Sequence, residues 1–197
     1  MLNLGFMASH GGSGMQAILE AIQHGLNAKA KVLIGNNQNS KAFAIAEQHE
    51  LATFHLSAKT HPNSNQLDLA ICSILQEHHI DLLVLSGYMK KLGPITLDKF
   101  ANKILNIHPS LLPNYGGQGM YGDHVHQAVI ANGDNQSGAS VHIVTAEYDQ
   151  GPVLKQTIVS LEANETVESL REKVKAIEGQ LYVDTLIGIT SGQIILP

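Results

Sequence analysis

The segment Asn106-Ile107-His108 places an amide and an imidazole two residues apart, in an apolar run that begins at Ile104. On an extended chain both side chains point to the same face. Together they can donate two hydrogen bonds to one oxygen, which would stabilise the oxyanion of an acyl transfer, and an imidazole can also exchange a proton near neutral pH. The simpler alternative is a strand end with a solvated histidine, and this motif alone leaves that alternative open.

Four small residues, Gly11-Gly12-Ser13-Gly14, follow the first apolar run and precede a stretch with helical spacing. Their backbone N–H groups could converge at a helix N-terminus, which suits a phosphate. The stretch lacks the three spaced glycines of a dinucleotide turn and the lysine of a nucleotide P-loop. A tight turn that binds nothing is therefore the alternative, although the carboxyl end of a parallel strand favours a ligand.

Short apolar runs alternate with segments of helical periodicity along much of the chain. The runs that predict strands are residues 2–7, 31–35, 52–56, 82–85, 104–107, 139–144 and 152–161. The segments that predict helices begin near residues 15, 40, 67 and 166, whereas the polar stretch 57–66 predicts a loop. This order predicts an α/β fold: a Rossmann-like, mostly parallel sheet with helices on both faces and an antiparallel edge. No linker divides the chain, so we expect one domain over residues 1–197.

The composition argues against several classes of protein. The 197 residues carry a formal net charge of −5 with no long run of lysine or arginine, which argues against a nucleic-acid partner. No apolar run reaches the roughly 18 residues of a membrane span, and the first residues lack the charged start of a signal peptide. We therefore expect a cytoplasmic protein with small-molecule substrates. Cys72, the only cysteine, is expected to be a buried apolar residue.

The longest motif, Asn-Ile-His-Pro-Ser-Leu-Leu-Pro at residues 106–113, resembles the signature of the folate-dependent formyltransferases, most closely the phosphoribosylglycinamide formyltransferase family. Ser86-Gly87-Tyr88-Met89 resembles the strand end with which this family contacts folate. Gly-Ala-Ser-Val-His at residues 138–142 and Tyr-Asp-Gln-Gly-Pro at residues 148–152 resemble its second signature. The similarity covers nearly the whole chain, and the combination of motifs is much more specific than the asparagine–histidine pair alone.

The resemblance implies transfer of the formyl group of 10-formyltetrahydrofolate to the amine of glycinamide ribonucleotide, which gives formylglycinamide ribonucleotide in de novo purine biosynthesis. It implies that Asn106 and a protonated His108 stabilise the tetrahedral oxyanion. It also places Asp149 near His108, where the carboxylate would help to move the proton from the amine to the leaving nitrogen. Without the resemblance, an aspartate so close to a glycine predicts only a turn.

The same resemblance implies which residues hold the two substrates. Those implied to bind the ribonucleotide are Gly12, Ser13 and Gly14 at the phosphate, with Lys175 and Glu178 on the last helix, Glu178 at the ribose hydroxyls. Those implied to bind the folate, as formyl donor, are Met89, Lys90, Lys91, Leu92, Asn106, Thr145, Ala146, Glu147, Tyr148 and Asp149. For the two adjacent lysines we expect contact through the backbone, because adjacent lysines are more often solvated. Lys175 and Glu178 share a helix face, so a surface ion pair is their alternative.

No metal is expected at this site. His124 and His126 have the spacing of a strand pair, but no carboxylate or cysteine cluster accompanies them. The residues around them also look like a helix start, on which the two side chains would diverge. The resemblance makes His126 a residue of the pocket wall instead.

The sequence departs from the family pattern in three places. Gly14 stands where the family has an asparagine that contacts the nucleotide, so the acceptor could be another amine, such as an amino sugar nucleotide. A basic residue is missing near Ser64, which leaves contact with the glutamate tail of the folate open. The glycine-rich stretch 116–122 predicts a mobile lid over the amine substrate.

Other functions are less favoured. Formylmethionyl-tRNA synthesis and formylfolate hydrolysis would each need a further domain, which we do not expect here. A non-enzymatic binding module would be indicated by loss of Asn106, His108 or Asp149, and all three are present. A plain dinucleotide-binding module predicts an acidic residue after the second strand, where Asn36-Asn37 stands. The sequence does not distinguish a monomer from a homodimer.

Overall fold

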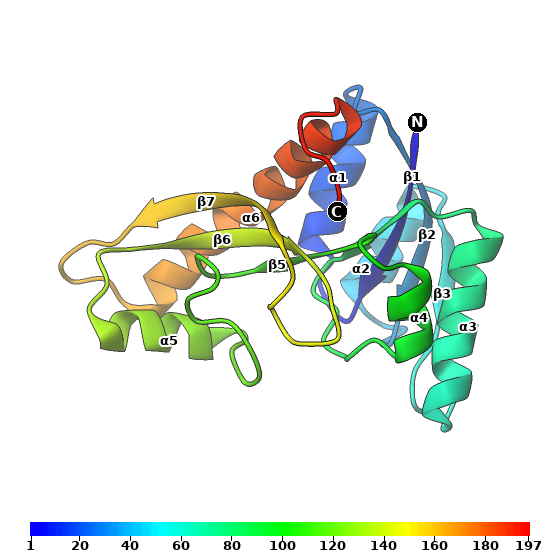
Figure 1. The fold of residues 1–197 in the computed structure, drawn as a ribbon, viewed down its shortest axis with the longest axis horizontal. Helices are drawn as coiled ribbons and strands as arrows, with labels where there is room; N and C mark the ends of the chain where they lie inside the picture. Colours follow the sequence, from blue (N-terminus) through cyan, green and yellow to red (C-terminus); the bar gives the residue numbers. More distant parts are fainter.

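The computed structural model describes all 197 residues, which form a seven-stranded sheet with helices around it (Figure 1). The strands are β1 Leu2–Ala8, β2 Ala28–Gly35, β3 Ala52–His55, β4 Leu82–Leu85, β5 Ile104–His108, β6 Gln136–Ile143 and β7 Val153–Ser160. The helices are α1 Ser13–Gln23, α2 Lys41–Gln48, α3 Ser64–Glu77, α4 Pro94–Lys99, α5 Asp123–Asn132 and α6 Val167–Thr190. None of these helices combines the length and apolar character that a membrane crossing requires.

The sheet has the strand order β3-β2-β1-β4-β5-β6-β7. The strands from β3 to β5 pair in parallel, and β6 and β7 continue the sheet as an antiparallel edge. The chain winds outward from β1 to β3 and returns to β4 beside β1, so the winding reverses between β1 and β4. Open α/β sheets bind ligands at the carboxyl ends of the strands on either side of such a reversal. The observed sheet confirms the predicted, mostly parallel fold with an antiparallel edge.

Helices cover both faces of the sheet, because its central strands are apolar on both sides. All four residues of β4 are buried, as a continuous apolar run predicts. On one face, 25 buried residues join the sheet to α1, α2, α5 and α6, and on the other face 13 join it to α3 and α4. Phe6 belongs to the first cluster and its neighbour Met7 to the second, in keeping with the alternation of a strand. Cys72 is buried and unpaired in the second cluster, as predicted.

Helix α3 begins earlier than the sequence suggests. Its first residue, Ser64, lies inside the stretch 57–66 that was expected to be a loop. Asn63 caps the helix, because its Oδ1 accepts hydrogen bonds from the N–H groups of Asn65 at 2.9 Å and Gln66 at 3.1 Å. The polar composition of this stretch therefore reflects a helix cap as well as a loop.

The short helix α4 has no counterpart among the predicted elements. It starts at Pro94, and the N–H groups of Ile95 and Thr96 donate to the carboxylate of Asp68 on α3, at 2.8 and 3.1 Å. That carboxylate lies so close that a Cβ on Gly93 would be 2.1 Å from its Oδ2. A partner from another helix thus stabilises a turn that is too short to show periodicity, and α4 in turn fixes the segment that follows β4.

Candidate active site

Strand β5 carries Asn106 and His108 and pairs antiparallel with β6, so that Asn106 lies opposite His142 and His108 opposite Ser140. Because side chains alternate along a strand, Asn106, His108 and these partners share one face of the sheet. Asn106 and His108 therefore face the same way, as their spacing predicts. His108 is only 3% exposed, so the alternative of a solvated histidine is wrong.

His142 lies between Asn106 and Asp149. Its Nε2 lies 3.2 Å from Nδ2 of Asn106 and 3.5 Å from Oδ1 of Asp149. Its Nδ1 lies 3.0 Å from the carbonyl oxygen of Ile143, which can only accept, so Nδ1 carries the proton. Burial lowers the pKa of the His142 imidazole, so near neutral pH the contact with Asp149 is not an ion pair and Nε2 accepts from the Asn106 amide. One amide N–H of Asn106 is thus engaged and the other is free for a ligand.

Asp149 reaches the strand pair from the loop between β6 and β7. Its Oδ2 lies 3.4 Å from Nδ1 of His108 and accepts a hydrogen bond from the N–H of Gly117 at 3.0 Å. The backbone of Asp149 has a φ of 56°, in the left-handed region. Two residues further on, a Cβ on Gly151 would lie 1.9 Å from the carbonyl oxygen of Ile143. The loop therefore folds back only with a glycine at that position, which accounts for the Asp-x-Gly spacing.

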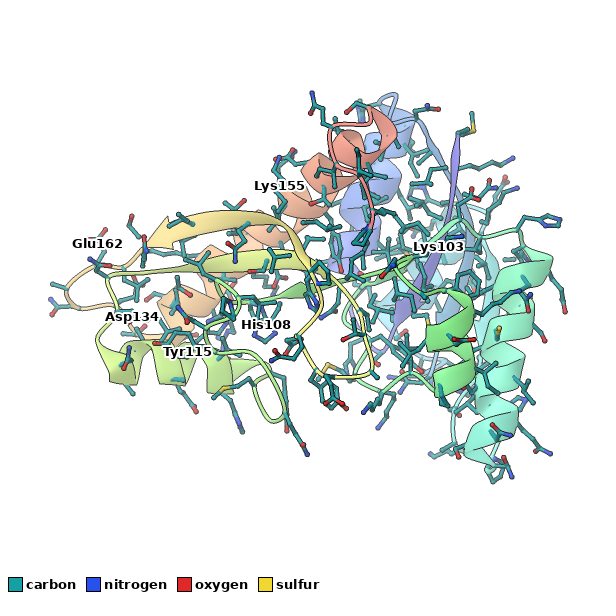
Figure 2. All side chains as sticks on the ribbon, in the orientation of Figure 1. Lys103, His108, Tyr115, Asp134, Lys155 and Glu162 are labelled. Atoms are coloured by element: carbon teal, nitrogen blue, oxygen red, sulfur yellow. The ribbon has the colours of Figure 1, made fainter.

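The other ring nitrogen of His108 faces the loop that follows β5. Its Nε2 lies 2.7 Å from the carbonyl oxygen of Tyr115, which makes this nitrogen a donor. The hydroxyl of Tyr115 in turn donates to Oδ2 of Asp134 at 2.6 Å. Figure 2 shows His108, Tyr115 and Asp134 close together beneath β6. The imidazole is thus held between two loops, with Nδ1 turned toward Asp149.

Ser110 is a structural residue at the exit of β5. It is fully buried, and its hydroxyl donates to the carbonyl oxygen of Asn114 at 2.6 Å. Its own carbonyl oxygen accepts a hydrogen bond from the hydroxyl of Ser140 at 2.6 Å, and the same hydroxyl accepts from the N–H of Leu112 at 3.0 Å. These contacts hold the segment after His108 in place.

The glycine turn follows β1 at the same edge of the sheet. Gly12 has a φ of 69°, which favours glycine, and α1 begins at the next residue. The N–H of Met15 donates to Oγ of Ser86, just past the end of β4, at 2.9 Å. The N–H groups of Ser13 and Gly14 have no protein acceptor, as is usual in the first turn of a helix, and remain available to an anion.

Helix α6 packs against this turn. Tyr182 is fully buried, its hydroxyl donates to the carbonyl oxygen of Leu85 at 2.6 Å, and a Cβ on Gly14 would lie 2.9 Å from its Cδ2. Glu178, one helical turn earlier, is mostly buried, and burial raises its pKa to about 7 against the opposing influence of Lys175. Lys175 is exposed and forms no ion pair with Glu178. The carboxyl group therefore lies near the glycine turn without a fixed cationic partner.

The two segments expected to bind the folate follow β4 and β6, on either side of β5. Met89 is 53% exposed, whereas Leu92 is buried. Lys90 and Lys91 are exposed, and Nζ of Lys91 lies 5.2 Å from the centre of the Tyr148 ring. The two segments thus touch across the end of β5.

A cavity of about 710 Å³ opens beside the segment after β4, toward the ends of β2 and β3 and the start of α3. Lys59, Lys90 and Lys91 line it together with Ser64, the position near which a basic residue is missing. The wall also includes Asn36, whose buried Oδ1 has no hydrogen-bond partner. Asn106, His108 and Asp149 do not line this cavity, so it is a neighbouring space rather than the centre of the chemistry.

His124 and His126 diverge on α5. His124 is exposed and stacks on Tyr121, with ring centres 5.4 Å apart. His126 is buried, its Nδ1 has no partner, and burial lowers its pKa. The two imidazoles therefore do not form a common site.

Three residues have roles in the site that were not predicted: His142, Tyr115 and Ser86. His142 lies in the motif at residues 138–142, and only the antiparallel pairing of β5 with β6 shows that it faces Asn106. Tyr115 contributes its backbone carbonyl oxygen, for which residue type gives no signal. Ser86 accepts a hydrogen bond from the N–H of Met15 in α1, which lies 71 positions earlier in the chain.

Comparison with known proteins gives a consistent result. Residues 2–186 match the formyl transferase family model. The chain is 34% identical to the phosphoribosylglycinamide formyltransferase of Haemophilus influenzae over 195 residues, 98% of this chain and 90% of the relative. It is 33% identical to the chloroplastic enzyme of the same name from Arabidopsis thaliana, covering 97% of this chain but only 66% of that longer relative. The solved structure of glycinamide ribonucleotide transformylase 1 from Symbiobacterium toebii superposes with a TM-score of 0.91 at 30% identity, over 100% of this chain and 91% of that one.

Proposed function

The chain belongs to the formyl transferase family, and on that premise we propose that it transfers the formyl group of 10-formyltetrahydrofolate to the amine of glycinamide ribonucleotide. The product would be formylglycinamide ribonucleotide, an intermediate of purine biosynthesis. The observation that carries the proposal is the contiguous cluster of Asn106, His142, Asp149 and His108 at the ligand-binding edge of the sheet.

In this reaction the amine nitrogen forms a bond to the formyl carbon, and the bond from that carbon to the folate nitrogen breaks. The attacking amine loses one proton and the leaving nitrogen gains one. We assign two donors to the oxyanion that forms in between: the free amide N–H of Asn106, and the Nδ1–H that His108 carries in its protonated form. The 3.4 Å separation of His108 from Asp149 exceeds the roughly 2.8 Å of a charge-assisted hydrogen bond, so Nδ1–H is not tightly held and can turn to a substrate oxygen. Asp149 would relay the proton.

The acceptor would bind along the edge between the glycine turn and α6. The free N–H groups of Ser13 and Gly14, with the backbone at Gly12, suit its phosphate. Glu178 suits the ribose hydroxyls, because its carboxyl group has no fixed partner, and the exposed Lys175 would lie at the rim. The amine end would then extend toward His108 on β5, two strands away from β1.

The donor would bind between the segment 89–92 and the loop 145–149. Its reactive end would approach Asn106 and Asp149, and its flat ring would lie against apolar and backbone surface. The neighbouring cavity suits the carboxylates of the glutamate tail, because three lysines line it although the basic residue expected around Ser64 in the sequence is missing. These ammonium groups would replace the expected one.

An amino sugar nucleotide remains the second candidate acceptor. Gly14 favours it, because the side chain that would contact the ribonucleotide is absent. Either acceptor presents a phosphate to the glycine turn and an amine to His108, so the chemistry at β5 would be the same.

The direct test is an assay of formyl transfer from 10-formyltetrahydrofolate to glycinamide ribonucleotide, followed by the absorbance change of the folate product. We expect turnover that depends on the ribonucleotide and is lost in the Asn106→Ala variant. Folate binding without turnover would overturn the acceptor, and turnover with an amino sugar nucleotide alone would establish the second candidate. Absence of both binding and turnover would overturn the proposal.

A further inference from the structure

We propose that Lys91 and Tyr148 form a clasp that closes the donor side of the site and holds the loop that carries Asp149. The assignment of this side to the donor rests on the proposed function. The clasp itself rests on a contact between two exposed loops, in which Nζ of Lys91 lies over the Tyr148 ring at 5.2 Å from its centre. A cation within about 6 Å of an aromatic ring centre is attracted by the electron density of the ring face.

The contact between Lys91 and Tyr148 spans the end of β5, the strand that carries the proposed catalytic pair. Lys91 follows β4, and Tyr148 lies between β6 and β7, whereas β5 lies between β4 and β6. The side chains therefore meet across the end of the strand that carries Asn106 and His108. In Figure 1 the loop after β6 comes down beside the segment that leads from β4 into α4.

The part of the loop before Asp149 has few other restraints. Residues 145–148 are exposed, and the hydroxyl of Thr145 donates only within the loop, to the carbonyl oxygen of Glu147 at 3.1 Å. No hydrogen bond joins residues 88–92 to residues 145–149. The cation–π contact is thus what ties the loop to the far side of β5.

The clasp bears directly on Asp149, the next residue. The carboxylate of Asp149 must stay near His108 at 3.4 Å, yet its backbone occupies the left-handed region, where residues other than glycine are uncommon. A contact at the adjacent Tyr148 helps to keep this conformation. Lys91 and Tyr148 are therefore positioning residues, and the clasp must open to admit a ligand between the two segments.

The clasp can be tested without any substrate, because the chain contains no tryptophan. In a Tyr148→Trp variant the single indole reports on the contact, and tryptophan is the strongest aromatic partner for a cation. We expect Lys91→Met in this background to raise the acrylamide quenching of the indole by about twofold. An exposed cation–π contact favours the closed arrangement of the clasp over the open one by only a few-fold, so the change is of that size. Lys91→Arg should restore the protection. The matched control is Lys103→Met, which removes an exposed lysine at the opposite end of β5 (Figure 2).

Kinetics supply the second readout. Lys91→Met and Tyr148→Leu should each lower kcat by about two- to fivefold, the range of an exposed cation–π contact, because the loop that carries Asp149 is held less well. The double variant should be no worse than either single variant. The KM for the ribonucleotide should not change. The clasp would be overturned if the kinetic effects of the two single variants multiplied in the double variant. It would also be overturned if Lys91→Met changed the quenching of the indole no more than Lys103→Met does. The quenching result stands even if the proposed reaction fails, so the two failures are distinguishable.

Discussion

The Nδ1 atom of His108 lies 3.4 Å from Oδ2 of Asp149, although the two residues come from a strand and from a loop 41 positions further along the chain. The opposite ring nitrogen of His108 is held by the carbonyl oxygen of Tyr115 at 2.7 Å. The imidazole therefore has one ring nitrogen fixed as a donor and the other turned toward a carboxylate. That asymmetry allows Nδ1 to exchange its partner for a substrate oxygen while the ring stays in place.

Removal of either partner should reduce the chemical step. We expect His108→Ala and Asp149→Asn each to lower kcat by about two to four orders of magnitude, the range for a lost oxyanion donor or proton carrier. The measurement is steady-state formyl transfer at saturating substrates. His24→Ala, which removes an exposed imidazole on the end of α1, is the matched control and should leave kcat unchanged. Near-normal activity in either site variant would remove that residue from the mechanism.

His142 should act through Asn106. Its Nε2 accepts from the amide of Asn106 at 3.2 Å, so His142→Phe keeps a buried ring but leaves the amide free to rotate. We expect kcat to fall by about tenfold to a hundredfold, less than the loss of an oxyanion donor itself, with little change in either KM. A variant with parental kcat would show that Asn106 is oriented without His142. A variant whose loss matches Asn106→Ala would show that orientation accounts for the full effect of the amide.

The sequence predicts this sheet well, because buried parallel strands are continuous apolar runs, and Leu82–Leu85 is one of them. It also predicts that Asn106 and His108 share a face, since that depends only on local alternation. It does not predict that His142 orients Asn106, because the register of β6 against β5 is set by the whole sheet. Helix α4 is also missed because it depends on a partner distant in the sequence: its first N–H groups donate to Asp68 from α3.

That dependence gives a stability prediction. The buried carboxylate of Asp68 accepts from the N–H groups of Ile95 and Thr96 and from the hydroxyl of Thr96, the last at 2.6 Å. Asp68→Ala should lower the free energy of unfolding by about 2–4 kcal/mol, because several buried donors lose a charged acceptor. Chemical denaturation measures the loss, and Asp98→Ala on the exposed side of α4 is the control. An Asp68→Ala variant as stable as the control would mean that α4 does not depend on this contact.

Glu178 should make stability fall as the pH rises. Burial raises its pKa to about 7 in the folded protein, whereas the unfolded chain has the ordinary value of 4.5. Between these values the folded state binds more protons than the unfolded state, so folding is progressively disfavoured as the pH increases. The penalty is absent below about pH 4.5 and complete above about pH 7, where it amounts to at most roughly 3 kcal/mol.

Glu178→Gln removes the ionisable group but keeps its shape, so it should remove this penalty. We expect the variant to be more stable than the parent at pH 8 and close to it at pH 5, as measured by denaturant unfolding at each pH. Glu47→Gln, on the exposed side of α2, is the control and should show no such trend. A stability difference that does not change with pH would show that Glu178 ionises normally. If the trend is found together with weaker ribonucleotide binding, the buried carboxyl group lowers stability in order to hold the substrate, as binding groups often do.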